Sequence, residues 1–435
     1  MDLSQLKTIF ESNGCEKIYV KVLSANDNSK NQVYFGSSFE ILNILPISEI
    51  RNEVAGNWEK ERFKASINFH WIGEDGHLYL APNSQLILYP KYPEVRFSGF
   101  LQNCENAPSK LMTKRLANRL LFFSVTKNGI IIGYVADPNS LITNEFNHLN
   151  SVDVHGVFKI IELNGSKNKR EILLSELLRI HQLGWIKSKS LTKNGVIVPC
   201  ESSNCGGYTL EAELGIIRNG VSDPDFLGWE IKSFGVNNFN NINSKVITLF
   251  TPEPTNGLYK LEGVEYFLRK YGYYDKKGRE DRINFGGVHK VGIKQSLTNL
   301  ELKLIGFDEQ SGKIRNTDGR VALIDLYGNE AASWSFLSML KHWNNKHNQA
   351  CYIPSLLEKS NERHYQYGSK IILGTGTDFQ LFLSEMAKGN IYYDPGIKME
   401  NESTKPIIKK RSQFRIKSGN LSNLYKVNEI IDLTI

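Results

Sequence analysis

Short runs of alternating hydrophobic and polar residues fill the first third of the chain and predict β-strands. A Gly- and Asp-containing turn at residues 73–76 joins two of them into an expected hairpin. Apolar residues recur at helical spacing in residues 3–11, and Pro108 opens a second helix that we expect to run through Leu121. The pattern predicts a β-rich domain over residues 1–165. The expected strands are 18–23, 32–36, 64–72, 77–80, 85–89, 95–100 and 129–136.

Helices and strands are mixed in the rest of the chain. The polar stretch GSKNKR, at residues 165–170, precedes this part and is typical of a linker. We therefore expect a second domain over residues 166–435. Its expected helices are 171–181, 208–217, 258–271, 332–343 and 376–388, and its expected strands are 228–233, 245–250, 291–292, 300–307, 321–326 and 414–417.

Composition places the chain among soluble globular proteins. Hydrophobic residues make up 40% and charged residues 23% of the 435 positions, and both fractions are ordinary for that class. The net charge of +7 permits a nucleic-acid partner without requiring one. The length suggests two or three domains.

The five cysteines follow no regular spacing, which argues against a disulfide framework. Cys200 and Cys205 are close together, but no second Cys or His pair stands near them at the spacing of a zinc site. We expect free thiols in a reducing cytoplasm. The first 14 residues resemble an amphipathic helix rather than a signal peptide, and no run of about 18 apolar residues predicts a membrane span. A cytoplasmic protein is expected.

The candidate chemistry lies around residues 228–233, where the chain alternates like a strand. Alternation places Glu230 and Lys232 on one face and Trp229 and Ile231 on the other, so the apolar face can pack on a core. Asp225 precedes Glu230 by five positions. Two carboxylates beside a lysine suit phosphodiester hydrolysis, because hard oxygen ligands hold Mg²⁺ and a lysine can position or deprotonate the attacking water.

Isolated E-x-K triplets are common and usually form a solvated surface pair. Glu301 and Lys303 form a second triplet of this kind, without an upstream Pro-Asp, and we interpret it as a surface strand. The first triplet differs because Glu211, on the expected helix at 208–217, supplies a third carboxylate. His342 and His347 lack the spacing of a zinc protease motif, and we interpret them as structural or phosphate-contacting.

The order L-E-x-x-L-G at 210–215, P-D at 224–225 and G-W-E-I-K at 228–232 resembles the core of the PD-(D/E)xK nucleases. The short distance between the Asp and the E-x-K is similar to the branch that holds the mismatch-repair nicking enzyme MutH and the MvaI/BcnI restriction endonucleases. The likeness to the MvaI/BcnI family extends from about residue 170 to the C-terminus.

This resemblance implies an α/β (α+β) fold, with a mixed sheet flanked by helices, and a type II restriction endonuclease that uses Mg²⁺, with Mn²⁺ as a substitute. Asp225 and Glu230 would be metal ligands, and Lys232 would act on the water. Glu211 would complete the acidic cluster directly or through water, and it is preferred to Glu213 because its setting matches the MutH-like pattern.

A basic run near the C-terminus is the candidate DNA-reading segment. Phe414 and Ile416 alternate with Arg415 and Lys417, so the two cations share a strand face. A solvated basic tail is the alternative, but the resemblance favours a strand that faces DNA. Arginine commonly reads guanine and lysine commonly contacts phosphate. The predicted DNA-binding residues are Arg415, Lys417, Lys409, Lys410 and Arg411.

Double-stranded DNA is the expected partner, with a DNA methyltransferase associated genetically rather than in a stable complex. The protein is expected to be a monomer, or a dimer formed on DNA. The first domain would be an accessory DNA-binding domain for an effector copy of the site or a modified base. Its candidate contacts, for which solvated surface or core packing is the alternative, are Lys110, Lys114, Arg115, Arg119, Trp71, Tyr79, Tyr89 and Tyr92.

Two other functions remain open at this point. One is a modification-dependent or mismatch-directed nicking enzyme with the same core. The other is a DNA-binding protein without catalysis on a degenerate nuclease fold, against which the intact set of Asp225, Glu230 and Lys232 argues.

Overall fold

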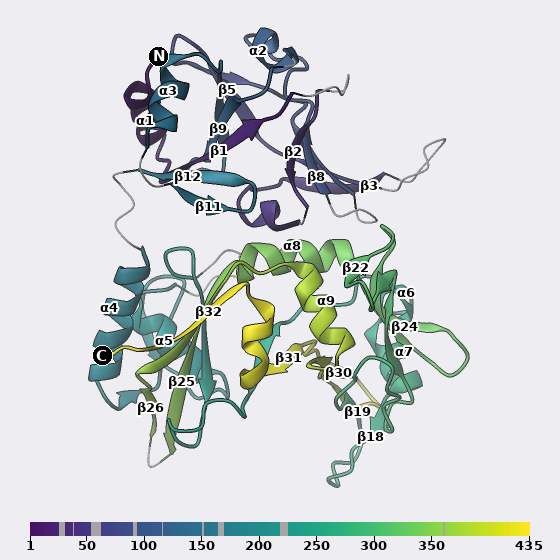
Figure 1. Cartoon of the computed structure of the whole chain (residues 1–435). Coiled ribbons are helices and arrows are strands. Elements are labelled where there is room, and N and C mark those ends of the chain that lie inside the picture. The colour runs from purple at the N-terminus through teal and green to yellow at the C-terminus, as the bar shows by residue number, and fades with distance from the viewer. Residues whose placement is uncertain are drawn as a thin grey trace. The chain divides into compact units, whose positions relative to one another are not determined.

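The computed structural model describes residues 1–25, 31–37, 39–53, 62–89, 94–114, 116–149, 152–163, 169–217, 225–359 and 362–435, apart from the side chains of Glu40, Lys341 and Asn345. The chain divides into two compact units, Met1–Lys169 (unit 1) and Arg170–Ile435 (unit 2) (Figure 1). Of the expected linker at 165–170, residues 165–168 lie outside the described residues. The architecture is mixed α/β, as expected, and unit 1 is rich in strands.

The described residues of unit 1 form two sheets. The larger has the order β11-β12-β1-β9-β10-β5-β6, in which β5 and β10 are parallel and the other neighbours antiparallel. The smaller has the order β2-β8-β7-β4-β3. Their bounds are β1 Lys17–Leu23, β2 Val33–Gly36, β3 Glu49–Glu53, β4 Arg62–Ser66, β5 Phe69–Ile72, β6 Leu78–Leu80, β7 Gln85–Tyr89, β8 Glu94–Ser98, β9 Arg119–Val125, β10 Ile131–Ala136, β11 Asp153–His155 and β12 Phe158–Glu162.

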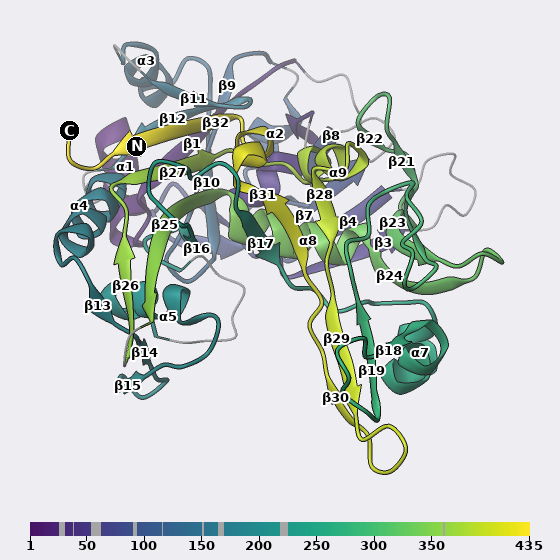
Figure 2. The same cartoon turned by 90° about the horizontal axis from the view of Figure 1, so that it is seen from below.

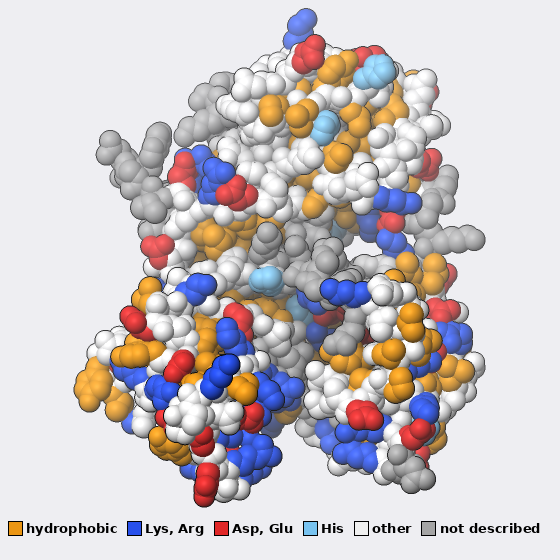
Figure 3. Space-filling model, turned by 180° about the vertical axis from the view of Figure 1, so that it is seen from behind, with side chains coloured by type: hydrophobic (Ala, Val, Ile, Leu, Met, Phe, Trp, Pro, Cys, Tyr) orange, Lys and Arg blue, Asp and Glu red, His pale blue; other side chains and the backbone are white. Residues whose placement is uncertain are grey.

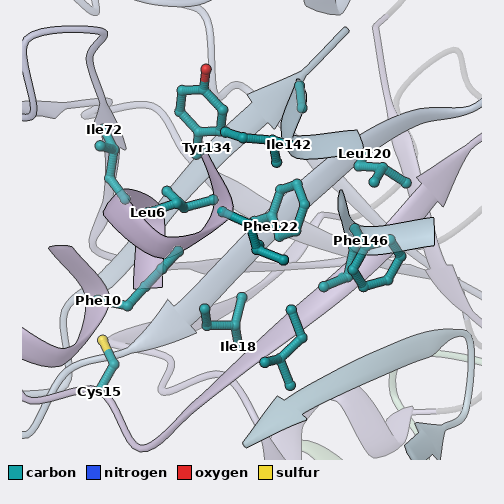
Figure 4. Close-up of a cluster of buried hydrophobic side chains, with 14 of the residues drawn as sticks. Leu6, Phe10, Cys15, Ile18, Ile72, Leu120, Phe122, Tyr134, Ile142 and Phe146 are labelled. Carbon is teal, nitrogen blue, oxygen red and sulfur yellow. The ribbon is translucent and has the colours of Figure 1, made fainter. Parts of the chain in front are cut away.

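A hydrophobic core of unit 1 joins the larger sheet to helices α1 (Leu3–Ser12) and α3 (Leu141–Asn147). Leu6 and Phe10 from α1 and Phe146 from α3 lie in one cluster with Ile18 and Phe122 (Figure 4). The expected helix at 3–11 is confirmed, because its apolar residues recur every three or four positions and so face the sheet together.

The helix expected through Leu121 is wrong beyond its first turn. α2 covers only Ser109–Thr113, and the continuous apolar run that follows forms β9, which is buried on both faces. A short buried strand of this kind has no alternation to distinguish it from a helix. The expected strand at 64–72 is also wrong, since it is two strands, β4 and β5, in different sheets.

The candidate DNA contacts of unit 1 are only partly at its surface. Arg119 is buried and donates hydrogen bonds to the backbone carbonyls of Leu111 (2.6 Å) and Leu116 (2.8 Å). Trp71 is fully buried, and its indole nitrogen donates to the carbonyl of Phe100 at 2.7 Å. Both side chains are therefore part of the interior of unit 1 rather than of a surface that could contact DNA. Lys110 and Lys114 are exposed, Tyr79 and Tyr89 are half-buried, and Arg115 and Tyr92 lie outside the described residues.

The main sheet of unit 2 has the order β13-β26-β25-β27-β32, with β16 added in parallel beside β25. Helices α4 (Lys169–Gln182) and α5 (Cys205–Glu213) pack on it through a core that includes Leu177, Leu210 and Ile353. The strands are β13 Ile186–Lys187, β16 Glu230–Gly235, β25 Gln349–Lys359, β26 Arg363–Tyr367, β27 Lys370–Thr375 and β32 Val427–Asp432.

Three smaller sheets build the other part of unit 2, in the orders β17-β31-β28, β20-β23-β24 and β18-β19-β29-β30. The strand pair β21–β22 belongs to this part, whereas the pair β14–β15 packs on α5 beside the main sheet. The bounds are β14 Lys189–Leu191, β15 Ile197–Pro199, β17 Val246–Phe250, β18 Tyr273–Tyr274, β19 Arg282–Gly286, β20 Glu301–Ile305, β21 Phe307–Asp308, β22 Lys313–Ile314, β23 Arg320–Ile324, β24 Glu330–Ser335, β28 Ile391–Tyr393, β29 Gly396–Glu400, β30 Ile407–Lys409 and β31 Phe414–Lys417.

Two expected helices of unit 2 need correction. Residues 330–335 form β24, and α8 (Phe336–His347) begins only after Ser335, whose side chain caps it by accepting from the Ser338 amide at 3.2 Å. The helix expected at 258–271 is two helices, α6 (Leu258–Leu261) and α7 (Gly263–Tyr271), because Gly263 has a φ of +88°. α9 (Phe379–Ala387) matches its expectation and is followed by Gly389 at φ +72°.

The expected strand at 291–292 is a single bridge between Val291 and Leu302. Within the described residues, no helix combines the length and the apolar character needed to cross a membrane.

Candidate active site

β16 carries the candidate catalytic pair at a defined place in the main sheet. It pairs in parallel with β25, with Glu230 opposite Ala350 and Lys232 opposite Tyr352. Trp229 and Ile231 are buried in the core beneath α4 and α5. Glu230 and Lys232 therefore share the other face, as the alternation predicts.

A tight turn before β16 brings Asp225 to the same place. Phe226 and Trp229 exchange backbone hydrogen bonds of 3.0 and 2.8 Å, and the two residues between them, Leu227 and Gly228, have φ of +50° and +89°. Positive φ at both central positions is the geometry of a two-residue hairpin turn, which favours glycine. The turn lets Asp225 Oδ2 accept a hydrogen bond from the Ile231 amide at 3.0 Å. Pro224 lies outside the described residues.

Glu230 is a buried carboxylate with only one of its oxygens engaged. Its Oε1 lies 2.8 Å from Lys232 Nζ and 3.4 Å from Lys346 Nζ, and its side chain is 3% exposed. Its Oε2 is buried and has no hydrogen-bond partner among the described residues. A buried charged oxygen without a partner is unfavourable, so this atom is suited to a ligand that the protein itself does not supply.

Burial and neighbouring charges give the carboxyl groups of Asp225 and Glu230 different pKa values. Burial, together with the charge of Glu230, raises the pKa of Asp225 to about 6. Burial also acts to raise the pKa of Glu230, but the charges of Lys232 and Lys346 outweigh it and lower that pKa to about 2. Glu230 is consequently ionised at neutral pH, and Asp225 is the group that takes up a proton as the pH falls through 6.

A cleft of about 880 Å³ opens over this face of β16. Glu211 of α5 lines it together with Glu230 and Lys232. Glu213 does not line the cleft and instead binds Lys189 Nζ at 2.5 Å and Arg179 at 3.6 Å. The geometry supports the choice of Glu211 over Glu213 as the carboxylate that faces the cleft.

Asp225 is half-buried beside Glu230 and is not among the residues that line the cleft. Among the described residues, no three His, Cys, Asp or Glu side chains converge as a metal-binding group. Glu211 is therefore separate from the pair that Asp225 and Glu230 form, and the pair is the candidate metal centre.

The C-terminal basic residues divide into two groups. Arg411 and Arg415 line the cleft, and Arg415 Nη1 lies 2.6 Å from Asp394 Oδ2. Lys409, Lys410 and Lys417 are exposed outside it. The expected strand at 414–417 is β31, and Phe414 and Ile416 face the core as the alternation predicts.

The model of the MvaI/BcnI restriction endonuclease family matches residues 174–425, which is more than half of the chain. This chain belongs to the MvaI/BcnI restriction endonuclease family. The family implies a DNA endonuclease, and the matched region holds Glu211, Asp225, Glu230, Lys232 and Arg415.

Solved structures similar to this family member include two of the restriction endonuclease MvaI. In complex with its cognate DNA substrate, MvaI is 20% identical with a TM-score of 0.47, and the match covers 61% of this chain and 98% of MvaI. In the absence of DNA the TM-score is 0.35, with the same identity and coverage.

The B3 domain of the UbaLAI restriction endonuclease, with cognate DNA, is 17% identical with a TM-score of 0.23, covering 36% of this chain and 98% of that domain. No curated protein matches the chain. The family assignment therefore rests on the family model.

Helix α8 supplies Lys346, a residue of the candidate site that sequence reasoning missed, and His347, which the sequence predicted to be structural or phosphate-contacting. Lys346 contacts Glu230, and His347 beside it is fully buried, with its ring stacked on Trp343 at a centroid distance of 4.2 Å. Burial lowers the pKa of His347 to about 3, so the ring is neutral. His342 and Lys346, four positions apart, both line the cleft. The spacing of four positions places both residues on one face of a helix and is visible in the sequence. Only the fold shows that α8 lies beside a strand more than 100 positions earlier.

The expectation of free thiols is wrong for one pair. Cys200 and Cys205 form a disulfide, while Cys15, Cys104 and Cys351 are free. The chain turns between the end of β15 and the start of α5, and this turn leaves the two Cα atoms 5.7 Å apart, within the range for a disulfide. Residues 203–207, which include cleft-lining residues, stand in or beside this loop.

Proposed function

We propose that this chain is a type II restriction endonuclease that hydrolyses both strands of duplex DNA at a short specific sequence, using Mg²⁺. The observation that carries the proposal is the buried Glu230 carboxylate, which lies beside Asp225 and shares its Oε1 with two lysines at the base of a cleft. Perturbed acids in a cleft are typical of catalytic sites.

The residues present fit a hard divalent cation. Among the described residues, Glu230 Oε2 is a buried oxygen without a hydrogen-bond partner, and Asp225 Oδ2 accepts from the Ile231 amide. Mg²⁺ is commonly held by one or two carboxylates, with water and substrate phosphate completing its shell. Asp225 and Glu230 would hold the ion, and Glu211 would act on it through water. When bound, such an ion neutralises charge on the phosphate and acidifies a bound water.

The chain's own groups would then act on the scissile phosphate. Lys232, whose side chain is 17% exposed, faces the cleft, and its ammonium group can orient the attacking water and stabilise the charge of the phosphorane-like transition state. Lys346 adds a second ammonium on the same carboxylate oxygen. Both lysines are held in place by Glu230, so the groups that would orient the water and stabilise the transition state are positioned before substrate arrives.

Arg415 and Arg411 are the proposed readers of the DNA bases, because they line the cleft. Asp394 fixes one end of the Arg415 guanidinium, which limits the directions in which it can donate. Lys409, Lys410 and Lys417 are exposed and suit phosphate contacts.

Cleavage of plasmid DNA tests the proposal directly. We expect Mg²⁺- or Mn²⁺-dependent cutting, with ends that share one sequence when the products are sequenced. Parallel digests of unmodified, methylated and mismatched duplexes distinguish this function from a nicking enzyme. Absence of cleavage on all of them, with DNA binding retained, would support a binding protein on a nuclease fold instead.

Unit 1 is proposed as an accessory DNA-binding domain, and residues 166–435 as the catalytic domain. Most of the net positive charge of the chain falls after residue 170, so DNA binding by unit 1 would use local contacts such as Lys110 and Lys114. Separate expression of the two parts tests the assignment. The second part should cut DNA in Mg²⁺, and the first should bind DNA with an affinity that falls steeply with salt.

A further inference from the structure

The sheet β18-β19-β29-β30 forms an arm of unit 2, together with its two turns at residues 275–281 and 401–406. Its base is anchored by buried Ile283, Phe285, Ile397 and Met399, and Phe285 packs on Phe267 of α7 at a centroid distance of 4.6 Å. Figure 2 shows β19, β29 and β30 running side by side away from the rest of unit 2. The arm is thus a fixed part of the fold.

The two turns meet at the tip of the arm. The Ser403 amide donates to Asp281 Oδ1 at 2.7 Å, and the Glu402 amide donates to the Asp281 carbonyl at 3.3 Å. Side chains from two segments separated by more than 100 positions therefore share one surface.

Cations without acidic partners gather on this surface. They are exposed, and among the described residues none has an acidic ion-pair partner. The set, named here the tip cations, is Lys276, Lys277, Arg279 and Lys405.

The acids of the arm are mostly engaged elsewhere. Asp275 accepts from Asn284 at 2.9 Å, Glu400 binds Lys398 at 2.6 Å, and Glu402 binds Arg269 at 2.5 Å. Glu280 is exposed beside the tip cations, and Asp281 lies in the same turn, so these two acids offset part of the charge of the four cations. The tip still presents an excess of positive charge to a partner.

The arm is continuous with the cleft. From the tip, the chain runs along β30 to exposed Lys409 and Lys410, and the next residue, Arg411, lines the cleft. Figure 3 shows Lys and Arg side chains along the bottom edge of the view on both sides of a notch. One strand thus links the proposed base-reading residues to the basic tip.

We propose that the tip cations bind the phosphate backbone of DNA that flanks the recognition site, and so extend the bound length of duplex beyond the cleft. This inference rests on the proposed function. Arg411 lies six positions after Lys405. At a strand rise of roughly 3.3 Å per residue, this spacing gives a reach of roughly 20 Å. At about 3.4 Å per base pair, the reach corresponds to roughly six base pairs of flanking DNA.

The test compares two charge-matched triple variants on two duplexes. The arm variant is Lys276→Ala, Lys277→Ala and Arg279→Ala. The control, Lys260→Ala, Lys313→Ala and Lys370→Ala, removes three exposed cations that lie outside both the arm and the cleft lining. Both duplexes carry the site found by end sequencing, with flanks of about 3 or about 12 base pairs, so that only the longer one reaches the tip. Binding is measured in Ca²⁺ over a range of salt concentrations.

The arm variant should bind the long duplex roughly tenfold more weakly than the control, with a salt slope lower by about one for each cation that binds phosphate in the wild type. On the short duplex the two variants should agree. Equal binding of the two variants to the long duplex would overturn the inference, and so would an equal loss on both duplexes. Failure of the wild-type protein to bind or cut any duplex would instead overturn the proposed function.

Discussion

Two strands of unit 2 carry the same triplet in different surroundings. On β16, Lys232 Nζ lies 2.8 Å from Glu230, and the side chains are 17% and 3% exposed. On β20, Lys303 Nζ lies 3.4 Å from Glu301, and the side chains are 47% and 35% exposed. An exposed pair of the second kind contributes about 0–1 kcal/mol and is screened by salt. The first pair is desolvated, so each of its charges acts strongly on its neighbours.

Sheet position produces this difference. β20 is an edge strand that pairs with β23 in a sheet of three. β16 lies beside the long β25, and the Asp225 turn and the end of α8 close around its polar face. The triplet is therefore a candidate for catalysis only where other elements bury it and place further charges beside it. Substitutions that remove these charges should change cleavage when made on β16 and leave it unchanged when made on β20.

The largest expected contrast is between the two lysines. Lys232→Ala should lower kcat by about 10²–10⁴-fold, because it removes a group that acts on the water and the transition state. Lys303→Ala should leave cleavage unchanged, since that lysine is an exposed member of a surface pair. Initial rates on one plasmid, with circular dichroism to check folding, provide the measurement. Equal effects of the two substitutions would mean that burial does not distinguish the strands.

The sequence predicted the core of the site because that part depends on local order. The alternation around Ile231 fixes which face Glu230 and Lys232 share, and the turn that aims Asp225 is encoded within five positions. The contribution of Lys346 could not be predicted, since it depends on how α8 ends against β16. The error at Leu121 has another cause, because β9 is buried on both faces and its apolar run carries no period.

Asp225→Asn should stabilise the metal-free protein while it abolishes cleavage. The pKa of Asp225 is raised from 3.8 to about 6, so the ionised form is disfavoured in the folded state. The penalty is small below pH 4, grows as the pH rises to 6 and is constant above it. Removing it should raise the free energy of unfolding by up to about 3 kcal/mol at pH 8. The amide oxygen that the substitution introduces can still accept the hydrogen bond from the Ile231 amide.

Urea unfolding at pH 4 and pH 8, without divalent ions, measures this gain. At pH 4 the variant and the wild type should nearly coincide, which serves as the internal control. With Mg²⁺ added at pH 8, only the wild type should gain stability, because ligand binding to the folded state stabilises it. A variant that is less stable than the wild type at pH 8 would contradict the assignment of Asp225 as a carboxyl group whose ionised form is disfavoured in the folded state.

Lys346→Ala should have an intermediate effect, of roughly tenfold to hundredfold on kcat. Lys346 helps keep both Glu230 and Asp225 ionised. Its removal should therefore move the acidic limb of the pH–rate profile to higher pH, since the carboxylate pair would take up protons more readily. Lys346→Arg keeps the charge and should restore the profile. A lower rate with an unmoved profile would mean that Lys346 serves only the packing of α8.

The smallest effects concern DNA recognition. Here too, a partly buried, ion-paired cation can be compared with an exposed one. Arg415 is partly buried and held by Asp394, whereas Lys409 is 64% exposed with its nearest acid, Glu400, at 3.8 Å. Arg415→Ala should weaken specific binding by about 1–3 kcal/mol and relax the preference at one base pair. Lys409→Ala should weaken binding to all sequences alike and lower the salt slope by about one. Competition of specific against random duplexes in Ca²⁺ measures both. If Arg415→Ala instead weakens binding to all sequences equally, then the Arg415 guanidinium contacts phosphate. Another cleft residue, such as Gln413, would then be the candidate base reader.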